Sequence, residues 1–261
     1  MKITIAGAGA MGSRFGLMLH NAGHEVVLVD GWKDHVEAIQ KDGLKANFNG
    51  VEVVVKLPAL LQSEVTESAT SDLIILFTKA MQLEKMLNDL KPVIHEKTKV
   101  LCLLNGIGHE EVIEKFVPKE NIFIGNTMWT AGMEGPGRVK LFGSGTVALK
   151  NLVDTDDAKE GALEIVEVLN SAGLKANYSE NILYAIYKKA CVNGTMNGLC
   201  TILLSNMYEF GSTTDAHMIV ENIVKEFAEV AKFENSVDGN YNDVPLSDFI
   251  INDIFYRINQ Q

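Results

Sequence analysis

The sequence "KITIAGAGAMG" at residues 2–12 limits the possible folds of this chain more than any other feature. A short β-branched run ends in Gly7, and Gly9 and Gly12 complete a G-x-G-x-x-G spacing before a stretch with helical apolar periodicity. The next run, "EVVLVD", has the composition of a second strand. Two parallel strands need a crossover between them, so this region predicts a βαβ unit with a glycine turn after its first strand.

The glycine turn predicts a dinucleotide site, with a purely structural turn as the alternative. Gly7 allows the tight turn, Gly9 lets backbone approach a pyrophosphate, and Gly12 packs the helix against the strand. The phosphate is expected at the helix N-terminus, where backbone N–H groups and the helix dipole favour an anion. The predicted cofactor-binding residues of this segment are Gly7, Ala8, Gly9, Ala10, Met11 and Gly12.

Asp30 ends the predicted second strand, about 20 residues past the glycines, where an acidic residue can accept hydrogen bonds from the adenosine ribose. Its charge would also repel a 2′-phosphate, so Asp30 favours NAD over NADP. Two observations oppose this reading: Lys33 lies nearby and could reach a phosphate, and an aspartate at a strand end can simply cap the next turn. FAD is disfavoured because the sequence has no second nucleotide signature.

The rest of the chain predicts a doubly wound α/β domain followed by a smaller all-α domain. Near-continuous apolar runs at 72–79 and 100–106 are typical of central parallel strands. A hairpin is expected around Asn49-Gly50, and later strands of the same sheet are expected at 122–129, 137–143 and 145–150. Helical periodicity then dominates, at 157–173, 181–204 and 215–233. The expected domains are residues 1–179 for the dinucleotide and 180–261 for substrate and dimerisation.

Lys189, Asn193 and Asn197 are spaced four residues apart, so on an α-helix they would form one polar row. Gly194 and Gly198 lie beside this row and suggest a close approach by another group. An ammonium group can stabilise the charge that grows on a carbonyl oxygen during reduction and donate the proton. Partial burial would lower the lysine pKa towards working pH. The alternative is a surface lysine and asparagines that bind neighbouring backbone.

Composition restricts the possible partners. The net charge is −11 and no basic cluster is present, which disfavours nucleic acid. No apolar run is long enough to span a bilayer. The three cysteines and six histidines are scattered, so we expect reduced thiols, a cytoplasmic protein and no metal site.

Several segments together resemble the ketopantoate reductase family (2-dehydropantoate 2-reductases). They are "KITIAGAGAMG", "LFTKAMQ", "LLNGIGHEE", "GNTMWTAG" with "GPGRV", and "YKKACVNGTMNGLCTI", in the family's order over residues 1 to about 205. The resemblance implies a Rossmann domain followed by a helical domain, with the active site in the cleft between them. It also implies a 2-oxo acid substrate, the usual reaction being NADPH-dependent reduction of ketopantoate to D-pantoate.

Residue by residue, the resemblance makes Lys189 the general acid and places Asn193 and Asn197 in contact with substrate. Asn105 is expected beside the nicotinamide, and Lys79, followed by Gln82, near the nucleotide. Without the resemblance, both residues have a structural alternative. An Asn-Gly pair after a strand is commonly a turn, and Lys79 could be a cation at a helix start. A histidine acid/base at His109 is disfavoured, because this residue opens a glutamate-rich helix and is expected to pair there.

Two departures from the family pattern refine these expectations. The sequence "VDGWKD" lacks the basic residue that NADPH-using members carry after the second strand, and it resembles the NAD-dependent branch that acts on bulky or branched D-2-hydroxy acids such as D-mandelate. The helical domain is also expected to be shortened. The family's carboxylate-binding serine and lysine-steadying glutamate have no clear counterpart, although Ser247 and Asp248 are available.

Three functions therefore stay open. The first is an oxidoreductase that transfers hydride between NAD(H) and C2 of a 2-oxo or D-2-hydroxy acid. The second is the NADPH-dependent ketopantoate reductase of pantothenate synthesis. The third is a dinucleotide-binding redox sensor with little catalysis. A homodimer is also expected, on the basis of apolar residues taken to be exposed: Phe249, Ile250, Ile251, Ile254 and Phe255.

Overall fold

The structure is a computed structural model that describes residues 1–67, 70–233, 240–241, 244–245, 250–252 and 254. The chain divides into two compact units. The first contains Met1–Leu104 and Gly108–Ile182, and the second contains Asn105–Ile107 and Leu183–Gln261. The roles expected for the ranges 1–179 and 180–261 remain predictions.

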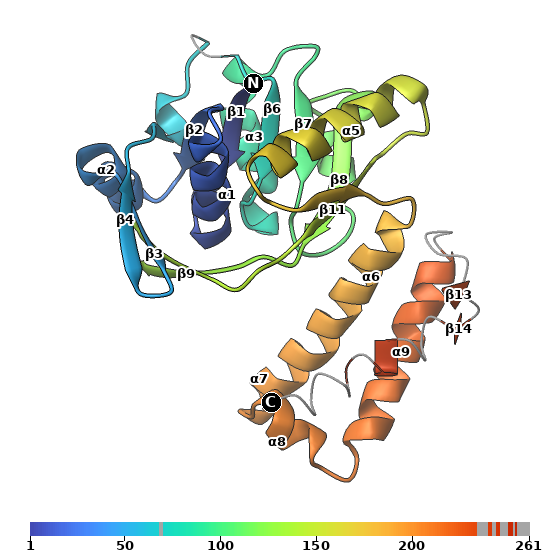
Figure 1. Ribbon diagram of the computed structural model, residues 1–261. Coiled ribbons are helices and arrows are strands. Elements are labelled where there is room, and N and C mark those ends of the chain that lie inside the picture. The colour runs from blue at the N-terminus through green and yellow to red at the C-terminus, as the bar shows by residue number, and fades with distance from the viewer. Residues whose placement is uncertain (68–69, 234–239, 242–243, 246–249, 253, 255–261) are drawn as a thin grey trace. The chain divides into compact units, whose positions relative to one another are not determined.

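An eight-stranded sheet forms the centre of the first unit, in the order β12-β11-β8-β7-β6-β1-β2-β5 (Figure 1). The strands β1, β2, β5, β6, β7 and β8 pair in parallel, and β11 runs antiparallel to β8. All four residues of β6 are buried, as a central parallel strand requires. The strand bounds are β1 Lys2–Ala6, β2 Glu25–Asp30, β5 Ala59–Leu61, β6 Leu73–Leu76, β7 Lys99–Cys102, β8 Ile122–Thr127, β11 Val147–Asn151 and β12 Ala176–Tyr178.

This strand order confirms the predicted doubly wound α/β fold. The chain leaves β1 towards β2 on one side and returns to β6 on the other side, so the strand order reverses beside β1. In sheets of this kind ligands bind at that reversal, outside the carboxyl ends of the strands. A ligand site is therefore expected outside the carboxyl end of β1.

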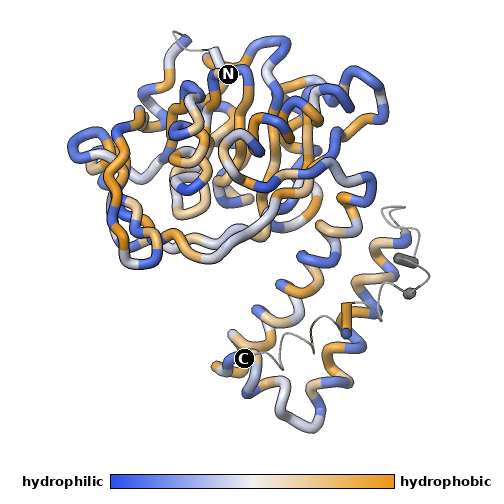
Figure 2. The backbone as a smooth tube through the Cα atoms, in the orientation of Figure 1, coloured by the Kyte–Doolittle hydropathy of each residue, from blue (hydrophilic) through white to orange (hydrophobic). Residues whose placement is uncertain are grey.

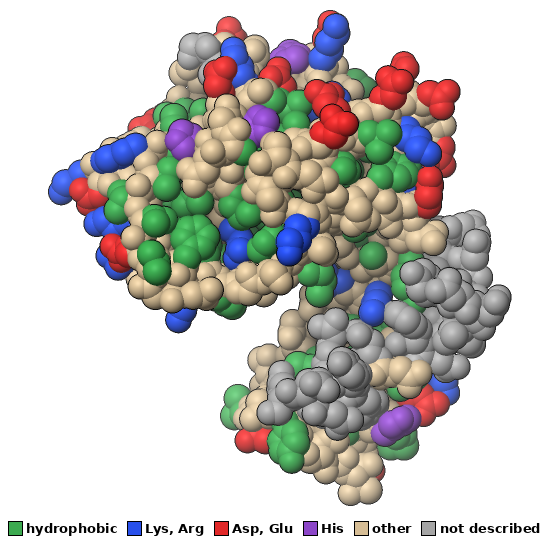
Figure 3. All heavy atoms as spheres, viewed as in Figure 1, with side chains coloured by type: hydrophobic (Ala, Val, Ile, Leu, Met, Phe, Trp, Pro, Cys, Tyr) green, Lys and Arg blue, Asp and Glu red, His purple; other side chains and the backbone are tan. Residues whose placement is uncertain are grey.

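Helices accompany the sheet of the first unit, and α1 and α5 lie in front of it in Figure 1. Buried residues of α1 include Phe15, Leu17 and Leu19. The Thr155 side chain caps α5 by accepting a hydrogen bond from the Ala158 N–H, at 3.3 Å. Figure 3 shows acidic side chains gathered over the α5 region of the surface. The helix bounds are α1 Ala10–Asn21, α2 Lys33–Asp42, α3 Leu83–Asp89, α4 Glu110–Ile113 and α5 Asp156–Ser171.

A separate four-stranded sheet corrects one expectation. It has the order β4-β3-β10-β9, formed by β3 (Leu44–Phe48), β4 (Val51–Val55), β9 (Thr130–Gly135) and β10 (Arg138–Phe142). We expected 137–143 in the main sheet, but β10 pairs with β3 and β9, whereas β8 and β11 do join the main sheet. The physical reason is the alternating burial of β10, which buries only one of its two faces, unlike a central parallel strand. Asn49 and Gly50, both with positive φ, confirm the hairpin turn.

Arg14 of α1 attaches this second sheet to the rest of the unit. Its side chain is buried, and its Nη1 donates hydrogen bonds to the carbonyls of Thr130, at 2.7 Å, and Phe142, at 3.1 Å. The guanidinium carbon lies 4.1 Å from the centre of the Trp129 ring. A buried positive charge is thus accommodated by carbonyl dipoles and an aromatic face.

The second unit consists mainly of helices. Figure 2 shows hydrophilic and hydrophobic residues alternating along α6 and α9. Its core contains Tyr184, Tyr187, Met196, Val220 and Val224. None of the described helices has both the length and the apolar character needed to cross a bilayer. The element bounds are α6 Ile182–Val192, a π-helix Asn193–Asn197, α7 Gly198–Leu203, α8 Met207–Gly211, α9 Ala216–Phe233, β13 Asn240–Tyr241 and β14 Val244–Pro245.

The apolar residues near the end of the chain are not the exposed surface that we expected. Ile250, Ile251 and Ile254 are 1%, 8% and 0% exposed and belong to the core of the second unit. Burial in this core removes their apolar side chains from water without a partner chain. Phe249 and Phe255 lie outside the described residues, as do Ser247 and Asp248. The homodimer stays a prediction without this support.

Candidate active site

The three glycines of the turn at the carboxyl end of β1 differ in their surroundings. The packing of the protein itself requires glycine at two of the positions but not at the third. Gly7 has φ +100°, and a Cβ there would lie 2.6 Å from the Thr78 backbone nitrogen. A Cβ at Gly12 would lie 1.8 Å from the Gly7 carbonyl oxygen. A Cβ at Gly9 would have no described heavy atom within 4 Å. Gly9 is therefore the position where the turn is open to a ligand.

The N-terminus of α1 offers hydrogen-bond donors beside Gly9. The helix begins at Ala10, and the first N–H groups of any α-helix have no acceptor within the helix. The first turn of α1 has the sequence AMGS, so it brings no carboxylate of its own to this end of the helix. Free donors and the positive end of the helix dipole together favour an anion such as a phosphate.

Asp30 joins the end of β2 to this turn. Its Oδ2 accepts a hydrogen bond from the Ala8 N–H at 2.6 Å, and its Oδ1 accepts one from the Trp32 N–H at 2.8 Å. Each carboxylate oxygen can accept a further hydrogen bond, for example from a ribose hydroxyl. Lys33 forms an ion pair with Glu37 at 3.6 Å, and both side chains are exposed. The charge held against the turn is thus the negative charge of Asp30.

Two further side chains bind the turn, and the sequence analysis did not identify them. The Ala8 carbonyl accepts a hydrogen bond from Ser13 Oγ at 2.6 Å and lies 2.8 Å from His35 Nε2. His35 is completely buried in the first turns of α2, beside the buried Val36 and Ile39. The available signal was a histidine on the apolar face of a predicted helix, where a polar ring needs a partner.

The other residues expected near the cofactor lie in loops after β6 and β7. Lys79 is exposed and precedes the 3₁₀ turn Ala80–Gln82, whose last residue, Gln82, is also exposed. Asn105 is exposed in the loop after β7, and the partly buried His109 precedes α4. Their functional roles remain predictions.

The expected polar row lies where the long helix changes its geometry. Lys189, near the end of α6, is partly buried, and loss of solvent lowers its pKa from the ordinary lysine value. The partly buried Asn193 opens the π-helix and the exposed Asn197 closes it. A π-turn is wider than an α-turn, so the two asparagines do not follow the regular α-helical row that we expected. Such turns occur frequently at functional sites.

The two glycines beside this row differ from the expectation. A Cβ at Gly194 would lie 3.1 Å from Phe227 Cζ of α9, so this glycine makes room for packing inside its own unit. A Cβ at Gly198 would have no described atom within 4 Å. The pair therefore does not mark one shared approach surface, because the first glycine is already in contact with α9.

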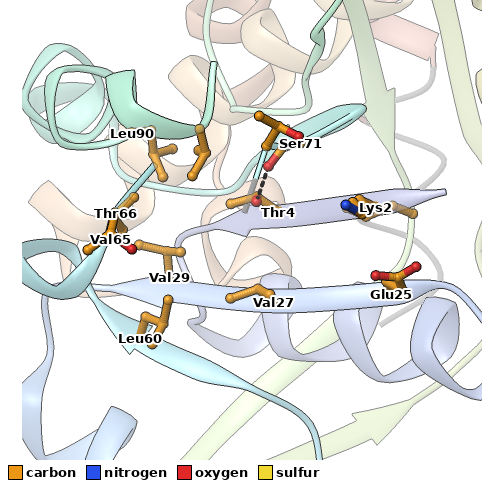
Figure 4. A pocket seen from close by; sticks show the side chains of 13 residues that line it. Lys2, Thr4, Glu25, Val27, Val29, Leu60, Val65, Thr66, Ser71 and Leu90 are labelled. Atoms are coloured by element: carbon orange, nitrogen blue, oxygen red, sulfur yellow. Dashed lines mark hydrogen bonds between the residues drawn. The ribbon is translucent and has the colours of Figure 1, made fainter. Parts of the chain in front are cut away.

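A cavity of about 250 Å³ lies in the first unit, along strands β1 and β2 (Figure 4). Its lining includes Lys2 and Glu25, which begin β1 and β2, and the pair Thr4 and Ser71, whose hydroxyl oxygens are 2.5 Å apart. Strands β1 and β2 are parallel, so their first residues lie at the opposite end of the sheet from Gly7. The lining extends along β2 as far as Val29, but it contains none of the residues predicted to bind cofactor or substrate. Within the described residues, no group of three acidic, histidine or cysteine side chains could hold a metal ion.

Comparison with known proteins gives one consistent result. A family model described as ketopantoate reductase PanE/ApbA matches residues 3–153. A 2-dehydropantoate 2-reductase of Lactococcus lactis is 65% identical over 235 residues, which is 90% of this chain and 75% of that protein. One of Streptococcus pyogenes serotype M3 is 46% identical over 234 residues, again 90% and 75%. Among solved structures, the ternary structure of D-mandelate dehydrogenase with NADH and anilino(oxo)acetate has 59% sequence identity to this chain and a TM-score of 0.91. The match covers 99% of this chain and 80% of the dehydrogenase chain.

Proposed function

This chain belongs to the ketopantoate reductase family of oxidoreductases, and we propose that it transfers hydride between NAD(H) and C2 of a branched or bulky 2-oxo acid or D-2-hydroxy acid. The observation that carries the choice of NAD is the Asp30 carboxylate, which is hydrogen-bonded to the glycine turn and forms no ion pair within the described residues. The similarity to a D-mandelate dehydrogenase solved with NADH supports the same choice.

The described residues fit a dinucleotide. The open backbone at Gly9 and the free N–H groups of the first turn of α1 suit a pyrophosphate. Asp30 suits the two ribose hydroxyls and disfavours a 2′-phosphate. When bound, the reduced nicotinamide supplies the hydride. The residues proposed to hold it are Gly7, Ala8, Gly9, Ala10, Met11, Gly12, Asp30, Lys79 and Asn105.

Lys189 is the proposed general acid. Its Nζ holds a proton that can pass to the substrate oxygen as negative charge grows there, and partial burial makes that proton easier to release. Asn193 and Asn197 would orient substrate through neutral hydrogen bonds, and Asn105 would help to position cofactor and substrate. The amide groups add no charge that could compete with the ammonium group.

The alternative is the NADPH-dependent reduction of ketopantoate. The specific observation in its favour is the name of the relatives that are 65% and 46% identical, 2-dehydropantoate 2-reductase. This alternative shares the Lys189 chemistry and differs at the cofactor ribose and the substrate side chain.

A substrate screen tests the proposal. Ketopantoate, phenylglyoxylate and branched 2-oxo acids are each reduced with NADH and with NADPH, and kcat/KM is compared across the set. The proposal expects the highest kcat/KM with NADH and a bulky or branched acid. The highest value with NADPH and ketopantoate would establish the alternative, and NADH binding without any turnover would indicate a redox sensor.

A further inference from the structure

A closed set of contacts surrounds the glycine turn. The Ala8 N–H donates to Asp30 Oδ2, and the Trp32 N–H donates to Asp30 Oδ1. The Trp32 ring stacks on the His35 ring with centroids 5.1 Å apart and an angle of 13° between the planes. His35 Nε2 lies 2.8 Å from the Ala8 carbonyl oxygen and completes the circuit. The end of β2 thus binds the backbone N–H of Ala8, and the start of α2 binds its carbonyl.

The hydrogen bond at His35 Nδ1 shows that the ring proton is on Nε2. The Gly137 N–H donates to His35 Nδ1 at 2.9 Å, so Nδ1 is an acceptor and carries no proton. The proton of the neutral ring is then on Nε2, which donates to the Ala8 carbonyl. Burial lowers the pKa of His35, which favours this neutral form, and Asp30 acts in the opposite direction.

The anchor on the far side of the ring is closely packed. Gly137 precedes β10 with φ +66°, and a Cβ there would lie 2.9 Å from the Ala38 Cβ of α2. The turn therefore sits directly against the helix that carries His35. Although 102 residues separate His35 from Gly137 in the sequence, the ring has a fixed support for its orientation.

Peptide geometry links His35 to the open end of the glycine turn. The Ala8 carbonyl and the Gly9 N–H belong to the same planar, trans peptide unit, so they point in opposite directions. A hydrogen bond that fixes the direction of the Ala8 carbonyl also fixes the direction of the Gly9 N–H. Gly9 is the position at which the turn is open.

We propose that His35 is a positioning residue for the dinucleotide, because its Nε2–H orients the Ala8–Gly9 peptide so that the Gly9 N–H faces the pyrophosphate. Ser13 Oγ supports the same carbonyl from α1. This inference rests on the proposed dinucleotide function. His35 would thus contribute to cofactor binding without touching the cofactor. The start of α2 would otherwise have only a packing role.

Two substitutions of His35 test the hydrogen bonds of its two ring nitrogens separately. The amide of glutamine reaches the ε position and can still donate to Ala8, whereas the amide of asparagine reaches only the δ position and can still accept from Gly137. NADH affinity is measured by fluorescence titration of the full chain, and stability by urea unfolding. We expect His35→Asn to weaken NADH binding by about tenfold, the equivalent of one lost buried hydrogen bond. His35→Gln should stay within about threefold of wild type.

The matched control is His24→Asn, since His24 lies in the same unit and pairs with Ser171 through Nε2, at 3.0 Å. This variant should bind NADH like wild type. The inference is overturned if His35→Asn and His35→Gln lose the same affinity, or if both bind like wild type. A wild-type protein that binds neither NADH nor NADPH would instead refute the proposed function, whatever the variants do.

Discussion

The backbone N–H of Ala8 donates a hydrogen bond of 2.6 Å to the carboxylate of Asp30. The residue that the sequence assigns to cofactor choice therefore also holds the turn that is expected to receive the pyrophosphate. The two roles do not conflict, because a carboxylate oxygen can accept more than one hydrogen bond. Substitutions at Asp30 should consequently change both the selectivity and the strength of cofactor binding.

The first prediction concerns that double role. Asp30→Ala and Asp30→Arg should raise the ratio of kcat/KM for NADPH to that for NADH by about tenfold or more, because the charge that repels a 2′-phosphate is gone. Both should also lower kcat/KM with NADH, since the Ala8 N–H loses its acceptor. Asp42→Ala, at the exposed end of α2, is the control and should leave the ratio unchanged. An unchanged ratio in Asp30→Arg would contradict the assignment.

The second prediction separates two glycines of one motif. Gly12→Ala should lower the free energy of unfolding by about 2 kcal/mol or more, because the new Cβ overlaps the Gly7 carbonyl oxygen. Gly9→Ala should change it by less than about 0.5 kcal/mol while weakening NADH binding, since its Cβ projects into open space. Urea unfolding and NADH titration measure the two effects. Equal destabilisation by both substitutions would refute the distinction.

The third prediction tests the general acid. Lys189→Ala should lower kcat by about 10²–10⁴-fold, the usual contribution of a positioned proton donor. NADH binding should stay within about threefold of wild type, because Lys189 is not assigned to the dinucleotide. Lys188→Ala, one residue earlier on α6, is the matched control and should retain kcat. Equal losses in the two variants would remove Lys189 from the proposed chemistry.

The fourth prediction is a pH profile. Burial lowers the pKa of Lys189 below the ordinary 10.5. A general acid works only while protonated, so kcat/KM for reduction should fall as pH rises through an apparent pKa below 10.5. For the reverse oxidation, kcat/KM should rise through the same value, because the amine must then accept the proton. A reduction profile that stays flat on the alkaline side, or one whose alkaline limb persists in Lys189→Ala, would contradict this role.

The fifth prediction compares two arginines. Arg14→Ala should lower the free energy of unfolding by about 2–4 kcal/mol, because the carbonyls of Thr130 and Phe142 lose a charged donor whose side chain is buried between the second sheet and α1. Arg138→Ala should cost less than about 1 kcal/mol, since its ion pair with Glu52 is exposed. Urea unfolding of both variants provides the measurement. A smaller loss for Arg14→Ala than for Arg138→Ala would show that the second sheet does not depend on the buried contact.

Local patterns were sufficient for much of the fold. The glycine spacing, the apolar runs of the central strands and the Asn49-Gly50 turn each depend on residues close together in the chain, and each was confirmed. The long polar helix was predicted only in part, because a periodicity argument assumes one helical geometry and does not identify the π-turn at Asn193–Asn197. Likewise, the sequence does not show that the apolar residues near the end of the chain are buried, because their packing partners in the second unit are distant in sequence.

By itself, the sequence determined the doubly wound unit, the turn at its first strand and Asp30 at the end of its second strand, because short-range spacing and periodicity encode these features. Only the tertiary structure placed β10 in the second sheet and brought His35 between Ala8 and Gly137. Those contacts join segments as much as 102 residues apart. Such pairing depends on which surfaces meet when the chain packs, and no pattern of neighbouring residues specifies that.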